Sequence, residues 1–318
     1  MEAHEDDDEI FVYMGGNQQV PERVRRARIH KSVKIIVERA FFYRRHLISV
    51  EFHDGIEIIE EGAFYFCYSL RRSIKLLGIK IIKAKAFFCC RNLTNAEFGD
   101  KLETIGVQAF NYCISLRTII IPSVRTIGKW AFLECKQLTD LDLPEGLETV
   151  GEDAFSFCTR LRRITLSLKD GMIENGVFNN CYNLTSVDLV GGIHKTVASL
   201  HMESWRNELK GEINRINPIP NTNSNSFKTR AIQQWMGSVI RRLDHYKAEN
   251  QKILKEATTL LELALWKANL DDNEGGVVQR EGVRTTRRQL KRARKEICVT
   301  SGASIVIKNV LPFLTLLE

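Results

Sequence analysis

Hydrophobic residues recur along much of this chain at a nearly constant interval. The pair Ala-Phe occurs six times and is followed by one Val-Phe, with steps of 23 residues and a single step of 22. An interval of this length is typical of solenoids, in which each repeat forms one coil and stacks on the next. The seven pairs are Ala40-Phe41, Ala63-Phe64, Ala86-Phe87, Ala109-Phe110, Ala131-Phe132, Ala154-Phe155 and Val177-Phe178.

Other positions keep the same register within the coils. The sixth residue after each Phe is Leu, and apolar residues alternate with polar ones nine and eleven residues after most of them, as at Ile164 and Leu166. Such alternation predicts a strand. Because one coil cannot close a core alone, its apolar rows must stack on those of its neighbours. We therefore expect an α/β repeat solenoid, a horseshoe or rod of about seven coils, over residues 21–190.

The coil resembles the BspA-type leucine-rich repeat. Its pattern is apolar-x-x-Ile/Val-x-x-x-Ala-Phe-x-x-Cys-x-x-Leu-x-x-Ile-x-Ile, and the resemblance covers residues 29–190. It implies a recognition or adhesion scaffold. Surface members of that family carry export signals, whereas the first nine residues here are acidic and lack the layout of such a signal. We therefore expect an intracellular protein, cytoplasmic or nuclear.

The second coil breaks the strand pattern. Its inward positions hold Ser73 and Lys75, while Ile74 and Leu76 lie one place along. A bulge between Leu70 and Ile74 would turn the two apolar residues inward, and burying Lys75 unpaired would cost several kcal/mol. We favour the bulge over an exposed apolar patch.

Cysteines and charged residues also recur with the period of the repeat. Six of the eight cysteines lie three residues after a Phe, at Cys67, Cys90, Cys113, Cys135, Cys158 and Cys181. Parallel side chains do not converge on a metal, so we expect buried free thiols rather than a metal ladder or disulfide stack. Seven residues before each of the first six of these Phe residues, the charge alternates in sign through Lys34, Glu57, Lys80, Glu103, Arg125 and Glu148, which would favour correct stacking.

The outward strand positions suggest a binding surface. Solenoids usually bind partners on the concave sheet, and the outward residues of this one lean acidic. The alternative is a plain solvated face, because no aromatic anchor occurs in these rows. The candidate partner-binding residues are Glu51, Glu97, Asp140, Asp142 and Asp188.

The regions flanking the solenoid are assigned by composition and helical spacing. Residues 1–20 form an acidic N-terminal segment and cap. Residues 191–216 have the spacing of a capping helix, 217–226 form a linker, and 227–318 form a helical region with a flexible basic loop at about 271–300. Apolar residues near Leu260–Trp266 favour either a small helical domain completed by Ser304–Leu317 or a dimerisation element.

Charge and motifs narrow the function. The net charge is +7, and Lys291, Arg292, Arg294 and Lys295 form a candidate nuclear import segment. A phosphate-binding glycine loop, paired histidine ligands and a nucleophile elbow are all lacking, so we expect no enzyme, no cofactor and no metal site. No apolar run reaches membrane-spanning length. The expected function is a scaffold that binds another protein, and the alternative is a nuclear or nucleic-acid-associated protein that acts through its basic segments.

Overall fold

The computed structural model describes residues 10–191, 193–217 and 227–274, with side chains of the last helix up to Lys267. The expected import segment, most of the expected linker, Cys298 and Ser304–Leu317 lie outside these residues. The chain divides into two compact units, Met1–Leu243 and Asp244–Glu318.

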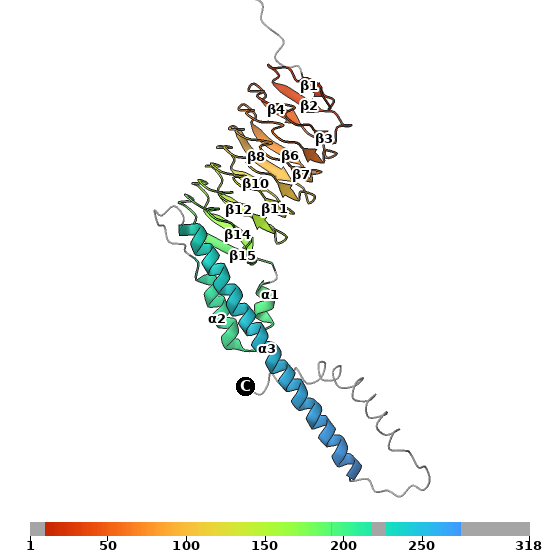
Figure 1. Cartoon of the computed structure of the whole chain (residues 1–318), viewed down its shortest axis with the longest axis vertical. Coiled ribbons are helices and arrows are strands. Elements are labelled where there is room, and N and C mark those ends of the chain that lie inside the picture. Colours follow the sequence, from red (N-terminus) through yellow and green to blue (C-terminus); the bar gives the residue numbers. More distant parts are fainter. Residues whose placement is uncertain (1–9, 192, 218–226, 275–318) are drawn as a thin grey trace, which may run out of the picture. The chain divides into compact units, whose positions relative to one another are not determined.

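The first unit is a parallel β-solenoid of about seven coils of about 23 residues (Figure 1). Most coils contribute one longer and one two-residue strand, and the paired strands of neighbouring coils run parallel in four sheets. The longer strands are β1 (Ile10–Tyr13), β2 (Arg26–Ile29), β4 (Ser49–Glu51), β6 (Arg72–Leu76), β8 (Leu93–Phe98), β10 (Thr118–Ile120), β12 (Asp140–Asp142), β14 (Arg163–Ser167) and β15 (Ser186–Val190). The short ones are β3 (Ile35–Ile36), β5 (Ile58–Ile59), β7 (Ile81–Ile82), β9 (Thr104–Ile105), β11 (Thr126–Ile127) and β13 (Thr149–Val150).

The repeated phenylalanines form the spine of the core. Their rings stack from Phe41 to Phe178 with centroids 4.9 to 6.1 Å apart, and all seven are fully buried. Tyr13, from β1, covers the first ring at 5.2 Å. The stack is therefore closed at its N-terminal end by a residue that precedes the first Ala-Phe pair.

The cysteine row is buried beside this stack. Each Sγ–H donates to the carbonyl of a Phe in the preceding coil, as in Cys113 to Phe87 at 3.2 Å. Burial raises the pKa of these thiols, to about 12 at Cys181. Arg44 takes the equivalent place in the first coil and donates to the Val20 and Phe42 carbonyls instead. The row thus has a structural role in joining coils.

The expected bulge in the second coil is confirmed. The register between β6 and β8 shifts between Arg72 and Ser73, and Arg72 takes a positive φ of 73°. Ile74 and Leu76 are buried as a result. Lys75 points outward and pairs with Glu97 at 2.9 Å.

The alternating charge row forms ion pairs between coils. Glu57 contacts Lys34 at 3.8 Å on one side and Lys80 at 2.7 Å on the other, and Arg125 contacts Glu148 at 2.9 Å. These side chains are exposed, so each pair adds little to the free energy of unfolding. Their geometry agrees with the proposed role in favouring correct stacking.

The single capping helix expected over 191–216 is instead two helices, α1 (Ile193–Ala198) and α2 (Glu203–Asn214). Ser199 Oγ donates to the Thr196 carbonyl at 2.7 Å, which satisfies a backbone acceptor locally and ends α1. The spacing of apolar residues does not show where a side chain will bond to the backbone, so it did not predict the end of α1.

The last coil is closed mainly by the start of α3 (Phe227–Glu274). In inner coils the Phe N–H donates to the next coil, as in Phe132 to Ala154 at 2.8 Å. Phe178 has no following coil, and its N–H donates to Thr229 Oγ1 at 2.8 Å.

Lys228 and Asn217 complete this closure. Lys228 is buried, and its ammonium donates at 2.7 to 2.9 Å to the carbonyls of Cys181, Tyr182 and Leu184. The Asn217 amide accepts from the Val187 N–H at 2.9 Å and donates to the Val187 carbonyl at 3.0 Å. A side-chain amide thereby takes the place of a neighbouring strand.

The second unit contains the rest of α3. The helix continues through Asn250 without the break that this polar residue suggested. It reaches Glu274, so the loop expected from residue 271 begins within the helix, and its remainder lies outside the described residues.

Candidate functional site

The outer strand face consists of the outward side chains of the longer strands. It holds all five acidic candidates, but most of them are paired across coils. Glu51 pairs with Arg28 and Glu97 with Lys75, while Arg163 contacts Asp142 at 3.2 Å and Asp188 at 2.7 Å. From β2 to β15 the longer strands also carry the basic residues Arg26, Arg28, Arg72, Lys75 and Arg163, against the five acidic ones.

The face is therefore nearly neutral rather than acidic. Sequence reasoning missed Arg28 because β2 precedes the first Ala-Phe pair, and it did not count Lys75 on this face although the expected bulge turns that side chain outward. An acidic excess remains only around Asp140, Asp142 and Asp188, with Arg163 among them. Ile120, on the same face, is 54% exposed.

A second surface was not expected from the sequence. The turns after the buried Phe residues carry stacked, partly exposed aromatic rings in the first four coils. Two arginines, Arg45 and Arg91, lie among them. We call this surface the aromatic–arginine ladder, and it consists of Phe42, Tyr43, Tyr65, Phe66, Tyr68, Phe88 and Tyr112 with Arg45 and Arg91.

The rings of the ladder contact one another from coil to coil. Phe42, Tyr65 and Phe88 are stacked with centroids 5.3 and 4.8 Å apart. Tyr43 meets Phe66 edge-on at 4.8 Å. Such contacts hold aromatic side chains in fixed orientations while part of each ring remains accessible.

The backbone at one ladder position disfavours a large side chain. The second residue after each buried Phe has a positive φ near 60°, as at Tyr43, Phe66 and Tyr112. Glycine and asparagine adopt this region more readily, whereas a bulky residue there is strained. Folding alone therefore does not favour aromatic residues at this position.

The arginines of the ladder are held by cation–π contacts. Arg45 lies over the Tyr43 and Tyr68 rings at 4.9 and 5.8 Å, and Arg91 lies over Tyr68 at 5.1 Å. Both arginines are exposed. Stacking occupies the face of a guanidinium and leaves N–H donors at its edge, where a carboxylate can bind in bidentate fashion.

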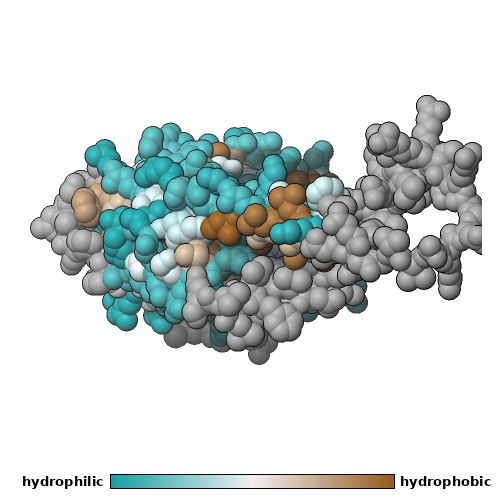
Figure 2. All heavy atoms as spheres, turned by 90° about the horizontal axis from the view of Figure 1, so that it is seen from below, coloured by the Kyte–Doolittle hydropathy of each residue, from teal (hydrophilic) through white to brown (hydrophobic). Residues whose placement is uncertain are grey.

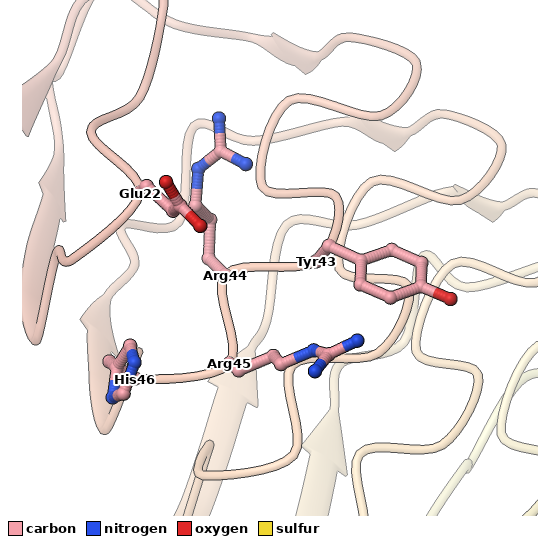
Figure 3. A pocket seen from close by; sticks show the side chains of 5 residues that line it. All are labelled: Glu22, Tyr43, Arg44, Arg45 and His46. Atoms are coloured by element: carbon pink, nitrogen blue, oxygen red, sulfur yellow. The ribbon is translucent and has the colours of Figure 1, made fainter.

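A shallow cavity of about 530 Å³ lies at one end of the ladder (Figure 3). Figure 3 shows Tyr43 and Arg45 extending side by side, while Arg44 extends toward Glu22 and His46 lies apart from them. The lining is polar and mostly basic. The sequence signal for the ladder was the aromatic residue directly after three successive buried Phe residues, at Phe42, Tyr65 and Phe88.

Sites for other chemistry are few in the described part of the chain. Its residues include no group of three or more His, Cys, Asp or Glu side chains that could hold a metal ion. Among the same residues, no helix combines the length and apolar character that crossing a membrane requires.

Comparison with known proteins identifies the repeat. The profile of the BspA type leucine rich repeat region matches residues 22–123 and 80–208, in six copies. The chain belongs to this family. The BspA-type resemblance drawn from the coil pattern is thereby confirmed.

Solved leucine-rich-repeat structures align with part of this BspA-type protein. A leucine rich cell surface protein from Faecalibacterium prausnitzii is 21% identical, with 52% of this chain and 59% of that chain covered and a TM-score of 0.37. A leucine-rich repeat protein from Bacteroides ovatus is 22% identical, with 52% and 61% covered and a TM-score of 0.39. The chain thus spans about three-fifths of each of these two proteins. None of the curated proteins matches it.

Proposed function

We propose that this BspA-type protein is a non-enzymatic scaffold that binds another protein through the aromatic–arginine ladder. Leucine-rich-repeat proteins are in general interaction scaffolds. The observation that carries the proposal is the presence of aromatic residues at strained, positive-φ turn positions, stacked on one another and beside cations. Tyrosine and arginine are enriched among the residues that dominate binding energy at interfaces.

The chemistry of the ladder fits an acidic polypeptide segment. The edges of Arg45 and Arg91 offer N–H donors to carboxylates, and the rings between them offer apolar area that is already ordered. Because the rings are held by their neighbours, little side-chain entropy would be lost on binding. The partner is therefore a protein segment that combines Asp or Glu with apolar residues.

The test uses substitutions that suit the turn backbone and should leave the solenoid folded. In a variant with Tyr43→Asn, Phe66→Asn and Tyr112→Asn, asparagine suits the positive φ and removes the rings. We expect affinity capture with the tagged full chain, quantified by mass spectrometry, to lose its main partner. The affinity of the variant for a peptide taken from that partner should fall by a factor of ten or more, since each hot-spot ring contributes about 1 kcal/mol or more.

The matched control is Phe157→Asn. Phe157 occupies the same turn position in the sixth coil, with a φ of 59°, but lies outside the ladder. It should leave capture unchanged, and all variants should keep the circular dichroism spectrum. Equal capture by the triple variant and the wild-type chain would rule out the ladder as the binding surface.

The acidic end of the outer strand face is a second candidate surface. Its remaining excess of negative charge around Asp140 favours a basic partner. The sequence suggested a partner-binding surface made of Glu51, Glu97, Asp140, Asp142 and Asp188 together. Asp140→Lys changes this region without breaking one of the ion pairs described above. We expect it to abolish capture only if this face is used.

The remaining parts of the functional hypothesis stay proposals. Nothing described here favours the nucleic-acid alternative, and its import segment lies outside the described residues. An intracellular site, cytoplasmic or nuclear, remains our proposal because a reducing compartment suits a protein with a row of free thiols.

A further inference from the structure

The second unit carries a stripe on α3 that is apolar apart from Asn250, is buried at Tyr246 and is exposed at Ile253 and Leu260. Tyr246, Asn250, Ile253, Ala257 and Leu260 follow one another at alternating spacings of four and three residues, which places them on one side of the helix. Ile253 is 38% exposed and Leu260 is 67% exposed. In Figure 2, exposed hydrophobic residues, coloured brown, lie among hydrophilic residues, coloured teal.

The stripe is wider than the seam of a two-stranded coiled coil. Leu254 and Leu261 flank it on one side, where a paired coiled coil usually carries charges that match those of its partner. The other side carries Glu249 and Glu256, which would face leucines of a second copy rather than lysines. A stripe of this width is typical of a helix that packs within its own domain.

The chain itself contains a segment of complementary chemistry. Nine of the fourteen residues from Ser304 to Leu317 are Ile, Val, Leu or Phe, and Lys308 is the one charged residue among them. Residues 275–303 separate this segment from α3. Even a partly extended connection of that length, at up to about 3.3 Å per residue, exceeds the roughly 20 Å along α3 from Glu274 back to Leu260.

We propose that Ser304–Leu317 covers the apolar stripe of α3 within the same chain, so that the second unit is a small helical domain. The contact would place Leu311 and Leu314 near Leu260. This inference does not depend on the binding surface proposed for the solenoid.

The test is photo-crosslinking in the full-length chain. The photoreactive amino acid p-benzoylphenylalanine is placed at Leu260, and adducts are mapped by peptide mass spectrometry after irradiation. We expect adducts within residues 304–317, in a product that migrates as a monomer at every protein concentration. The same amino acid at Lys255, on the opposite side of α3, should give no such adduct.

Two variants separate contact from misfolding. Leu311→Asp together with Leu314→Asp should abolish the adduct, whereas Thr315→Asp should preserve it. Circular dichroism and the urea unfolding of the solenoid should be unchanged in both. A crosslinked dimer would show that a second copy covers the stripe and would overturn the proposal. So would adducts that survive in the double variant, or an absence of adducts within 304–317.

Discussion

Replacement of Phe110 by alanine tests the stacked core most directly. Phe110 is fully buried, with Phe87 at 5.1 Å on one side and Phe132 at 5.2 Å on the other. Truncating a buried Phe to Ala costs about 3–5 kcal/mol through lost burial and the cavity left behind. Each stacked pair contributes about 0.5–1.5 kcal/mol beyond burial, and two pairs are lost. We therefore expect a value in the upper half of that range.

Equilibrium urea unfolding followed by far-UV circular dichroism measures this loss. Because coils are stabilised mainly by contacts with their nearest neighbours, damage in the fourth coil weakens the solenoid at its centre. Phe157→Ala is the control, since this ring is 38% exposed and outside the stack, and it should cost less than about 1 kcal/mol. An equally small cost for Phe110→Ala would refute the stacked row as the core.

Three further predictions concern the ends of the stack and the thiols. Lys228→Met should lower the free energy of unfolding by about 2–4 kcal/mol in urea titrations, because three carbonyls lose their donor, whereas Lys210→Met, on the exposed side of α2, should have little effect. Tyr13→Ala should cost about 3 kcal/mol by uncovering Phe41, and an unchanged unfolding midpoint would contradict that role. Thiol titration of the denatured, unreduced chain should count close to eight free cysteines. In the native chain the six thiols of the cysteine row should resist alkylation, because burial raises their pKa. A count of four or fewer in the denatured chain would contradict the buried-thiol interpretation.

Repetition explains how much of the fold could be predicted. A Phe, Leu or Cys that returns at a fixed interval reports the same environment several times, so the core rows and the coil length were predicted correctly. The bulge was also predictable, since only a shift in register keeps Lys75 out of the core. These conclusions needed only local patterns and the burial cost of polar groups.

The closure of the two ends of the solenoid depends on contacts that each occur only once, so the repeat pattern could not predict it. Thr229 bonds to a backbone N–H 51 positions away, and Lys228 bonds to carbonyls 44 to 47 positions away. Neither contact recurs along the chain, so no periodic pattern indicates it. The charge balance of the outer strand face was predicted incorrectly for a related reason, because Arg28 lies in a coil without an Ala-Phe pair.

Closure by residues outside the repeat leaves the number of coils free to vary. Tyr13 at one end and Lys228 at the other contact only the terminal coils, so duplication of inner coils would keep both ends intact. The alternating row through Glu57 and Lys80 adds a parity condition. Inserting one coil would place two like charges in adjacent coils, whereas inserting two would preserve the alternation. Lengthened versions of this solenoid should therefore tolerate added coils in pairs, in steps of 46 residues for two coils of 23.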